Sequence, residues 1–220
     1  MAKPAGVVEA LTELVDQDLP LTPIQRGFLA RNPELPPHWN QAVLLAVADG
    51  IGQQAIADAL AALVARHDAL RLRMVRTEDG RWHQRVVAVE TAAPLLVAQE
   101  VGADGLQDAC TAVQASLEPR HGPVVRGGLF HLPDGSRRLL IAVHHLAVDG
   151  VSWRVLAGDL DQMLGGDGAV LPPVPVPWSR WALAAGRPCR HSRRGWMVAG
   201  GPGRCSAMLC RWRRPGRSAA

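Results

Sequence analysis

The sequence predicts a mixed α/β fold, in which helices flank a mixed β-sheet. Three observations lead to this prediction: segments with the apolar spacing of helices, pairs of strand-like segments joined by Gly-containing turns, and a wholly apolar stretch at residues 139–143. Helical and strand-like segments follow one another without strict alternation, which favours a mixed sheet. With 220 residues, 48% of them hydrophobic and 20% charged, the chain can form one or two globular domains.

The first half of the chain contains a strand, a helix and a hairpin. Residues 42–47 are all apolar and are predicted to form a strand. Residues 53–69 place Ile56, Leu60, Leu63 and Val64 on one face and are predicted to form an amphipathic helix. Strands are predicted at residues 70–76 and 82–89, because the Asp79-Gly80 pair between them is typical of a hairpin turn.

The second half repeats this mixture. Residues 105–117 have helical spacing of Leu106, Cys110, Val113 and Leu117. Residues 124–132 and 138–143 are predicted to be a second pair of strands, joined through Pro133-Asp134-Gly135, and the apolar core of the later strand indicates burial on both faces. A last helix is predicted over residues 152–164, followed by a Pro-rich extended segment at residues 172–177.

Charge divides the chain into a mildly acidic body and a basic tail. The tail, residues 187–220, has nine Arg and no acidic residue, whereas residues 1–186 have 15 basic and 20 acidic residues. Residues 1–18 are treated as an N-terminal extension, since their four acidic residues and lack of an apolar core do not fit a signal peptide. No apolar run reaches the roughly 18 residues of a membrane-spanning helix, so a cytoplasmic location is expected.

Three interpretations of the tail remain open. Arg with interleaved Trp196 and Trp212 could bind nucleic acid, which we do not favour as a partner. A zinc site is disfavoured, since the Cys and His residues lack paired spacing; these are Cys189, His191, Cys205 and Cys210. The composition best fits out-of-frame translation of a G+C-rich gene, or a disordered tail. Cys110 is the single cysteine of the body, which argues against a disulfide framework.

The segment His144-His145-Leu-Ala-Val-Asp149-Gly150 carries the chemistry. It lies where the buried strand ends and the last helix begins. Because neighbouring strand residues point to opposite faces, one imidazole can enter a cleft while the other packs behind it. A histidine can exchange a proton at neutral pH, and Gly150 permits positive φ or close approach of a substrate. A purely structural pair stays an alternative, and a metal site is disfavoured by the divergence of the two rings.

This segment resembles the HHxxxDG signature of the condensation superfamily of non-ribosomal peptide synthetases. Two further motifs occur in that family's order: Leu-Thr-Pro-Ile-Gln-Arg at residues 21–26, and Arg-His-Asp-Ala-Leu-Arg-Leu-Arg at residues 66–73. Trp39-Asn40-Gln41 and the run Val148–Leu156 are similar to the epimerization branch. The resemblance covers residues 19–186, which we expect to be an N-terminal lobe of this type.

The resemblance implies a chloramphenicol-acetyltransferase-like lobe that acts on an aminoacyl or peptidyl thioester. A peptidyl carrier protein would present this substrate on its phosphopantetheine arm, and no cofactor would bind directly. His145 would be the acid/base residue, His144 its packed partner and Asp149 the anchor of the loop. Gly150, Ser152 and Trp153 are the candidate substrate-binding residues. The expected reaction is epimerization of the substrate α-carbon in secondary metabolism, such as antibiotic biosynthesis.

Two alternatives remain: a peptide-bond-forming condensation domain that uses the same histidine, and an inactive fragment that docks a carrier protein. The epimerization branch supplies a second acid/base residue, a Glu, from its C-terminal lobe, and no such motif follows Gly186. We therefore expect a truncated chain. Arg71 and Arg73 are expected on a solvated strand edge, and His67 at a helix C-terminus, where its charge suits the dipole.

Overall fold

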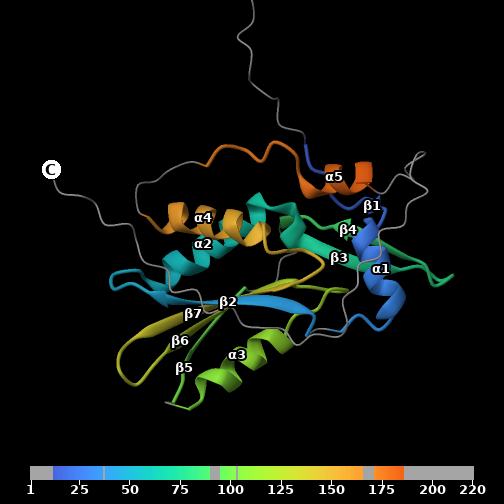
Figure 1. The fold of residues 1–220 in the computed structure, drawn as a ribbon. Helices are drawn as coiled ribbons and strands as arrows, with labels where there is room; N and C mark the ends of the chain where they lie inside the picture. Colours follow the sequence, from blue (N-terminus) through green and yellow to red (C-terminus); the bar gives the residue numbers. More distant parts are fainter. Residues whose placement is uncertain (1–11, 37, 90–94, 103, 166–170, 186–220) are drawn as a thin grey trace, which may run out of the picture.

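The computed structural model describes residues 12–36, 38–89, 95–102, 104–165 and 171–185. The Arg-rich tail and its cysteines lie outside these residues, as do residues 1–11. The described helices and strands form two sheets with helices packed around them (Figure 1). In chain order they are β1 (Asp18–Leu19), α1 (Pro23–Arg31), β2 (Asn40–Val47), α2 (Gln53–Arg66), the 3-10 helix η1 (Asp68–Arg71), β3 (Leu72–Arg76), β4 (Trp82–Val86), β5 (Leu96–Glu100), α3 (Leu106–Ala115), β6 (Val125–His131), β7 (Arg137–His144), α4 (Ser152–Leu164) and α5 (Trp178–Ala185).

The larger sheet is mixed, as predicted. Its strand order is β2-β7-β6-β5, with antiparallel pairing between β2, β7 and β6 and parallel pairing between β5 and β6. Helices α2 and α4 lie together over one face, and α3 lies on the other face (Figure 1). The sheet is therefore covered on both faces, which makes β7 the buried strand that the apolar run predicted.

The side chains of β7 alternate between two cores. Leu139, Ile141 and Val143 pack with α2 and α4, whereas Leu140 and Ala142 pack with α3. This explains why the run is apolar without a polar partner at every second position. Continued alternation directs His144 toward the α3 side, so the next residue, His145, can face the α2 and α4 side.

The smaller sheet, β1-β4-β3, adjoins a separate core. Gly80, at φ +81°, closes the predicted hairpin between β3 and β4. Residues from α1, β3 and the loop after β7 pack together here with several half-buried tryptophans. The buried members of this core are Leu21, Phe28, Leu29, Leu35, Leu72, Met74, Val124 and Leu146.

Two predicted boundaries at the end of α2 are wrong. The helix was expected to reach residue 69 and the strand to begin at residue 70. The helix ends at Arg66 because His67 takes an extended conformation, with φ −106° and ψ 99°, and residues 68–71 form one 3-10 turn. The strand therefore begins at Leu72. By contrast, α4 has the predicted bounds, Ser152–Leu164.

Arg71 and Arg73 are buried, which contradicts the prediction of a solvated edge. Arg71 is 1% exposed and Arg73 is 8% exposed. The Arg71 guanidinium donates to the carbonyl oxygens of Val64 (3.1 Å) and Val87 (2.6 Å) and to the Glu13 carboxylate. A buried cation is tolerated when its donors are matched in this way, so Arg71 ties α2 to the strand region around β4.

Among the described residues, no helix is both long enough and apolar enough to cross a membrane.

Candidate functional site

His145 follows the last residue of β7 and is half-buried. Its ring Nδ1 lies 2.7 Å from the carbonyl oxygen of Val148, and its backbone N–H donates to the carbonyl of Trp39 (2.8 Å). The Trp39 and His145 rings stack with 5.8 Å between centroids and an interplanar angle of 20°. A carbonyl oxygen only accepts hydrogen bonds, so Nδ1 carries a proton, and in the neutral ring the basic electron pair then lies on Nε2.

His144 is fully buried, and its ring carries the proton on the other nitrogen, Nε2. Its Nε2 donates to the carbonyl oxygen of Pro36 (3.3 Å), and its Nδ1 accepts from the backbone N–H of Leu146 (3.3 Å). Burial lowers the pKa of His144 from 6.5 to about 4. The ring is therefore neutral at neutral pH, and its two hydrogen bonds connect the end of β7 to Pro36 and Leu146.

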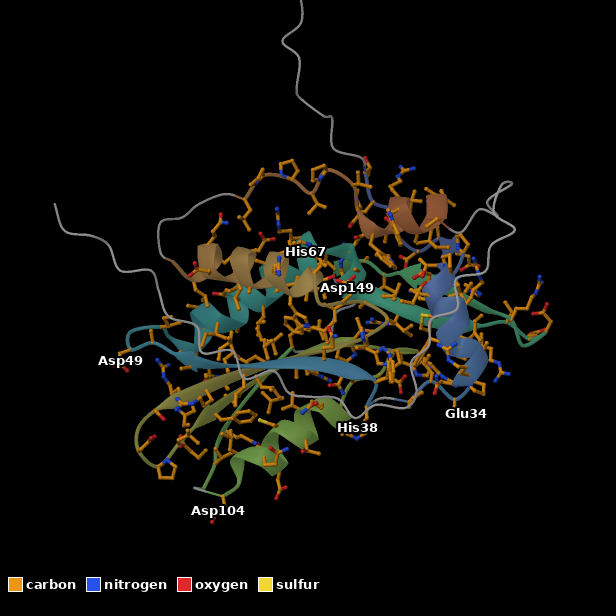
Figure 2. The ribbon with its side chains drawn as sticks, in the orientation of Figure 1. Glu34, His38, Asp49, His67, Asp104 and Asp149 are labelled. Atoms are coloured by element: carbon orange, nitrogen blue, oxygen red, sulfur yellow. The ribbon has the colours of Figure 1, made fainter. Side chains whose placement is uncertain are left out.

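Asp149 caps the start of α4. Its carboxylate accepts hydrogen bonds from the Ser152 hydroxyl (2.7 Å), the Ser152 N–H (2.8 Å) and the Val151 N–H (3.0 Å). These bonds, that from the hydroxyl most of all, hold the pKa of Asp149 below its ordinary value. The ionised carboxylate thus fixes the turn that joins His145 to α4. Figure 2 shows Asp149 and His67 on the α2 and α4 side of the larger sheet.

The three candidate substrate-binding residues lie together at this turn. Gly150 is exposed, its φ is not positive, and no atom lies within 4 Å of the position that a Cβ would take, so it leaves open space. The Ser152 hydroxyl is already bonded to Asp149. The Trp153 indole N–H donates to the Gln41 side-chain oxygen (2.9 Å). Contact between these residues and a substrate stays a prediction.

Gln41 and Trp39 belong to the site, although the sequence suggested no role for them beyond a family motif. Gln41 pairs with Val143 across β2 and β7, so its side chain shares the sheet face that α4 covers. Its Nε2 lies 3.4 Å from Nε2 of His145. A polar residue at the start of an otherwise apolar strand was the signal that could have found Gln41.

The first motif, residues 21–26, contacts the loop that follows His145. Thr22 and Gln25 form a capping box that starts α1, with bonds of 2.9 Å and 3.4 Å. The buried Gln25 amide donates to Gln84 of β4 (2.9 Å) and lies 3.4 Å from the carbonyl of Leu146, one residue after His145. The motif therefore links α1, the small sheet and the loop.

The second motif, residues 66–73, joins α2 to α4 through Asp159. The Asp159 carboxylate of α4 receives hydrogen bonds from Arg66 Nε and from His67 Nε2, both at 2.7 Å. His67 therefore lies at the C-terminus of α2, as predicted, and pairs with Asp159. Asp68 accepts from the backbone N–H groups of Trp178 and Ser179, both at 2.8 Å, and thereby caps α5.

Within the described ranges, no three His, Cys, Asp or Glu side chains are grouped so that they could hold a metal ion. His144 and His145 present their rings to different partners.

Comparison with known proteins agrees with this architecture. A crystal structure of the epimerization domain from the third module of tyrocidine synthetase B superposes with a TM-score of 0.68 and 34% identity, over 79% of this chain and 41% of that domain. The first condensation domain of the calcium-dependent antibiotic synthetase has a TM-score of 0.60 at 21% identity, over 72% of this chain and 40% of that one. The fold is therefore the chloramphenicol-acetyltransferase-like fold of such domains, a mixed sheet flanked by helices.

The family follows from the sequence. The condensation-domain model matches residues 15–187, so the chain belongs to the condensation-domain family of non-ribosomal peptide synthesis. A polypeptide of the linear gramicidin synthase of Brevibacillus parabrevis is 38% identical over 83% of this chain, and chondramide synthase of Chondromyces crocatus is 37% identical over 83%. The chain spans 4% and 5% of the lengths of these relatives. It corresponds to the N-terminal lobe, and its relatives include an epimerization-type domain.

Proposed function

We propose that this chain contributes the His145 side of an epimerization site for aminoacyl or peptidyl thioesters. The observation that carries the proposal is the ring of His145, whose Nδ1 lies 2.7 Å from the Val148 carbonyl oxygen, so that in the neutral ring the electron pair lies on Nε2. The substrate would arrive on the phosphopantetheine arm of a peptidyl carrier protein. Gly150, with open space around it, and Trp153 stand beside the turn that the arm would approach.

The chemical step moves one proton. Nε2 of His145 takes the α-proton, the α-carbon to hydrogen bond breaks, and its electron pair moves into the thioester to give an enolate. Return of a proton to the opposite face of the α-carbon inverts the centre. Inversion needs a second group on that face, for which the resemblance implies a Glu of the C-terminal lobe. His144 and Asp149 hold the loop that presents His145.

Similarity favours epimerization over peptide-bond formation. The tyrocidine synthetase epimerization domain is 34% identical, whereas the condensation domain of the calcium-dependent antibiotic synthetase is 21% identical and supports the fold alone. Both reactions would use the same histidine, so the test must follow the α-proton itself.

The test is α-deuterium incorporation. The chain is incubated in D₂O with an aminoacyl thioester on a carrier protein, and the α-carbon is assayed by mass spectrometry. Because one base suffices for exchange without inversion, we expect incorporation that His145→Gln lowers by 100-fold or more, the usual size of a lost general base, roughly 10²–10⁴.

The matched control is His131→Gln. His131 pairs with Arg137 at the opposite end of the β6 and β7 hairpin from His144, so this variant should exchange at the native rate. Unchanged exchange in His145→Gln, or no exchange with the native chain, would contradict the proposal. Peptide-bond formation between two loaded carriers, without α-exchange, would assign the condensation reaction.

A further inference from the structure

The side chains of Trp153, Gln41 and His145 form a directed hydrogen-bond chain from α4 to β2 and the loop. The indole Nε1 of Trp153 lies 2.9 Å from Oε1 of Gln41. The other end of the same amide, Nε2, lies 3.4 Å from Nε2 of His145. Trp153 and Gln41 are 112 residues apart in sequence, so only the folded chain brings the three together.

The chemistry of each group sets the direction of this chain. An indole nitrogen only donates, so it must face the carbonyl oxygen of the Gln41 amide. The amide NH₂ then faces His145, and it also only donates. Nε2 of His145 must therefore accept, and the ring proton must sit on Nδ1, where the Val148 carbonyl lies at 2.7 Å. Two independent contacts, one at each ring nitrogen, specify the same tautomer.

We propose that Trp153 and Gln41 are positioning residues that keep His145 in the neutral Nδ1–H tautomer, with Nε2 free of a proton. This inference rests on the proposed function, since it explains how the base is held ready between turnovers. A proton on Nε2 would place two donors, the ring N–H and the Gln41 NH₂, against each other. The amide therefore opposes the protonated ring and favours return of the proton to the substrate.

Within the part of the chain that the structure describes, Trp39, Asp149 and His144 also interact with the His145 ring. Trp39 stacks on its face and carries no charge. Among the titratable groups of the described residues, the ionised Asp149 and the buried His144 interact with it. Asp149 is an anion, whereas the Gln41 NH₂ presents a donor to Nε2 and therefore opposes a proton there.

The test reads ring protonation directly, without substrate. The full chain is labelled with ¹⁵N-histidine, and long-range ¹H–¹⁵N spectra are recorded at pH 7.5 and 6.5. At pH 7.5 we expect His145 as the Nδ1–H tautomer and His144 as the Nε2–H tautomer, so the adjacent rings serve as opposite internal standards.

The decisive variant is Trp153→Phe, which keeps an aromatic ring but removes the donor. Gln41 can then turn its oxygen toward Nε2, so the ratio of doubly protonated to neutral His145 at pH 6.5 should rise roughly fivefold, the size of one net hydrogen bond. Gln41→Glu places an acceptor at both contacts and should raise this ratio further.

The matched control is Trp181→Phe. Trp181 is 48% exposed in α5 and its ring contacts Trp178, so this variant also replaces an indole by a phenyl ring but does so away from Gln41, and it should leave the His145 ratio unchanged. A proton on Nε2 of His145 in the native chain, or a native ratio in Trp153→Phe, would overturn the proposal. Loss of stability at a native ratio would assign Trp153 a packing role alone. Failure of α-deuterium exchange would remove the proposed function and leave these spectra unaffected.

Discussion

At the residue scale, His144 makes the stability of the fold depend on pH. Its pKa is 6.5 when unfolded and about 4 in the folded chain, because burial disfavours the charged ring. Between these values the unfolded chain binds more protons, so stability is fully present above pH 6.5 and falls as the pH drops toward 4. The loss amounts to about 3 kcal/mol.

The measurement is urea unfolding at pH 7.5 and pH 4.5 for the native chain and His144→Gln. The variant should be less stable at pH 7.5 and should lose less stability on acidification than the native chain does. His131→Gln serves as the histidine control with native pH dependence. If His144→Gln loses as much unfolding free energy between pH 7.5 and pH 4.5 as the native chain does, other groups account for the acid sensitivity.

The chemistry of the site was partly predictable from single residues. Alternation along β7 correctly separated the surroundings of His144 and His145, because period two is a property of any strand. The burial of Arg71 was not predictable, since its partners Val64, Val87 and Glu13 come from three different segments. A local sequence pattern predicts on which face of a strand a side chain lies. It does not predict which carbonyl groups from distant segments the fold brings next to that side chain.

At the element scale, Asp68 decides whether α5 is held in place. Its two carboxylate oxygens cap the first two N–H groups of that helix, and Asp68 is 4% exposed. Asp68→Ala removes both acceptors, so we expect a loss of about 1–3 kcal/mol in unfolding free energy and faster hydrogen exchange at residues 178–182.

Asp79→Ala is the control for Asp68→Ala. Asp79 pairs with Arg81 on an exposed turn, at 53% side-chain exposure, so its removal should leave exchange in α5 at the native rate. Native exchange at residues 178–182 in Asp68→Ala would show that packing alone, such as that of Trp178 against Val86 and Leu19, retains the helix.

Elements with strong periodicity or specific turn residues were predictable. Helix α4 and the two hairpins closed at Gly80 and Gly135 follow from apolar spacing and from glycines at positive φ. Strand β5 was missed, because it lies at the sheet edge, is largely exposed and has no alternating pattern. Helix α1 was missed although Thr22 and Gln25 form a capping box, a start signal that is visible in the sequence.

At the scale of the whole molecule, exposed apolar side chains lie directly beside the candidate site. Val151 is 71% exposed and Val155 is 51% exposed, and their spacing of four residues places them on one face at the start of α4. Isolated exposed valines are ordinary, but these two are adjacent, and the chain covers only 41% of the tyrocidine synthetase epimerization domain, so we expect this face to bind another protein surface.

This surface predicts self-association of the chain. Sedimentation velocity at rising concentration should show concentration-dependent oligomers, and the double variant Val151→Ser, Val155→Ser should shift the distribution toward monomer, since it removes two exposed apolar groups. Val176→Ser is the matched control, because Val176 is 49% exposed but precedes α5 rather than α4, and it should associate as the native chain does. If the native chain stays monomeric throughout, or if both variants reduce association equally, the face formed by Val151 and Val155 does not mediate self-association. A selective effect would place the interface next to His145, where the proposed epimerization requires a second acid/base group.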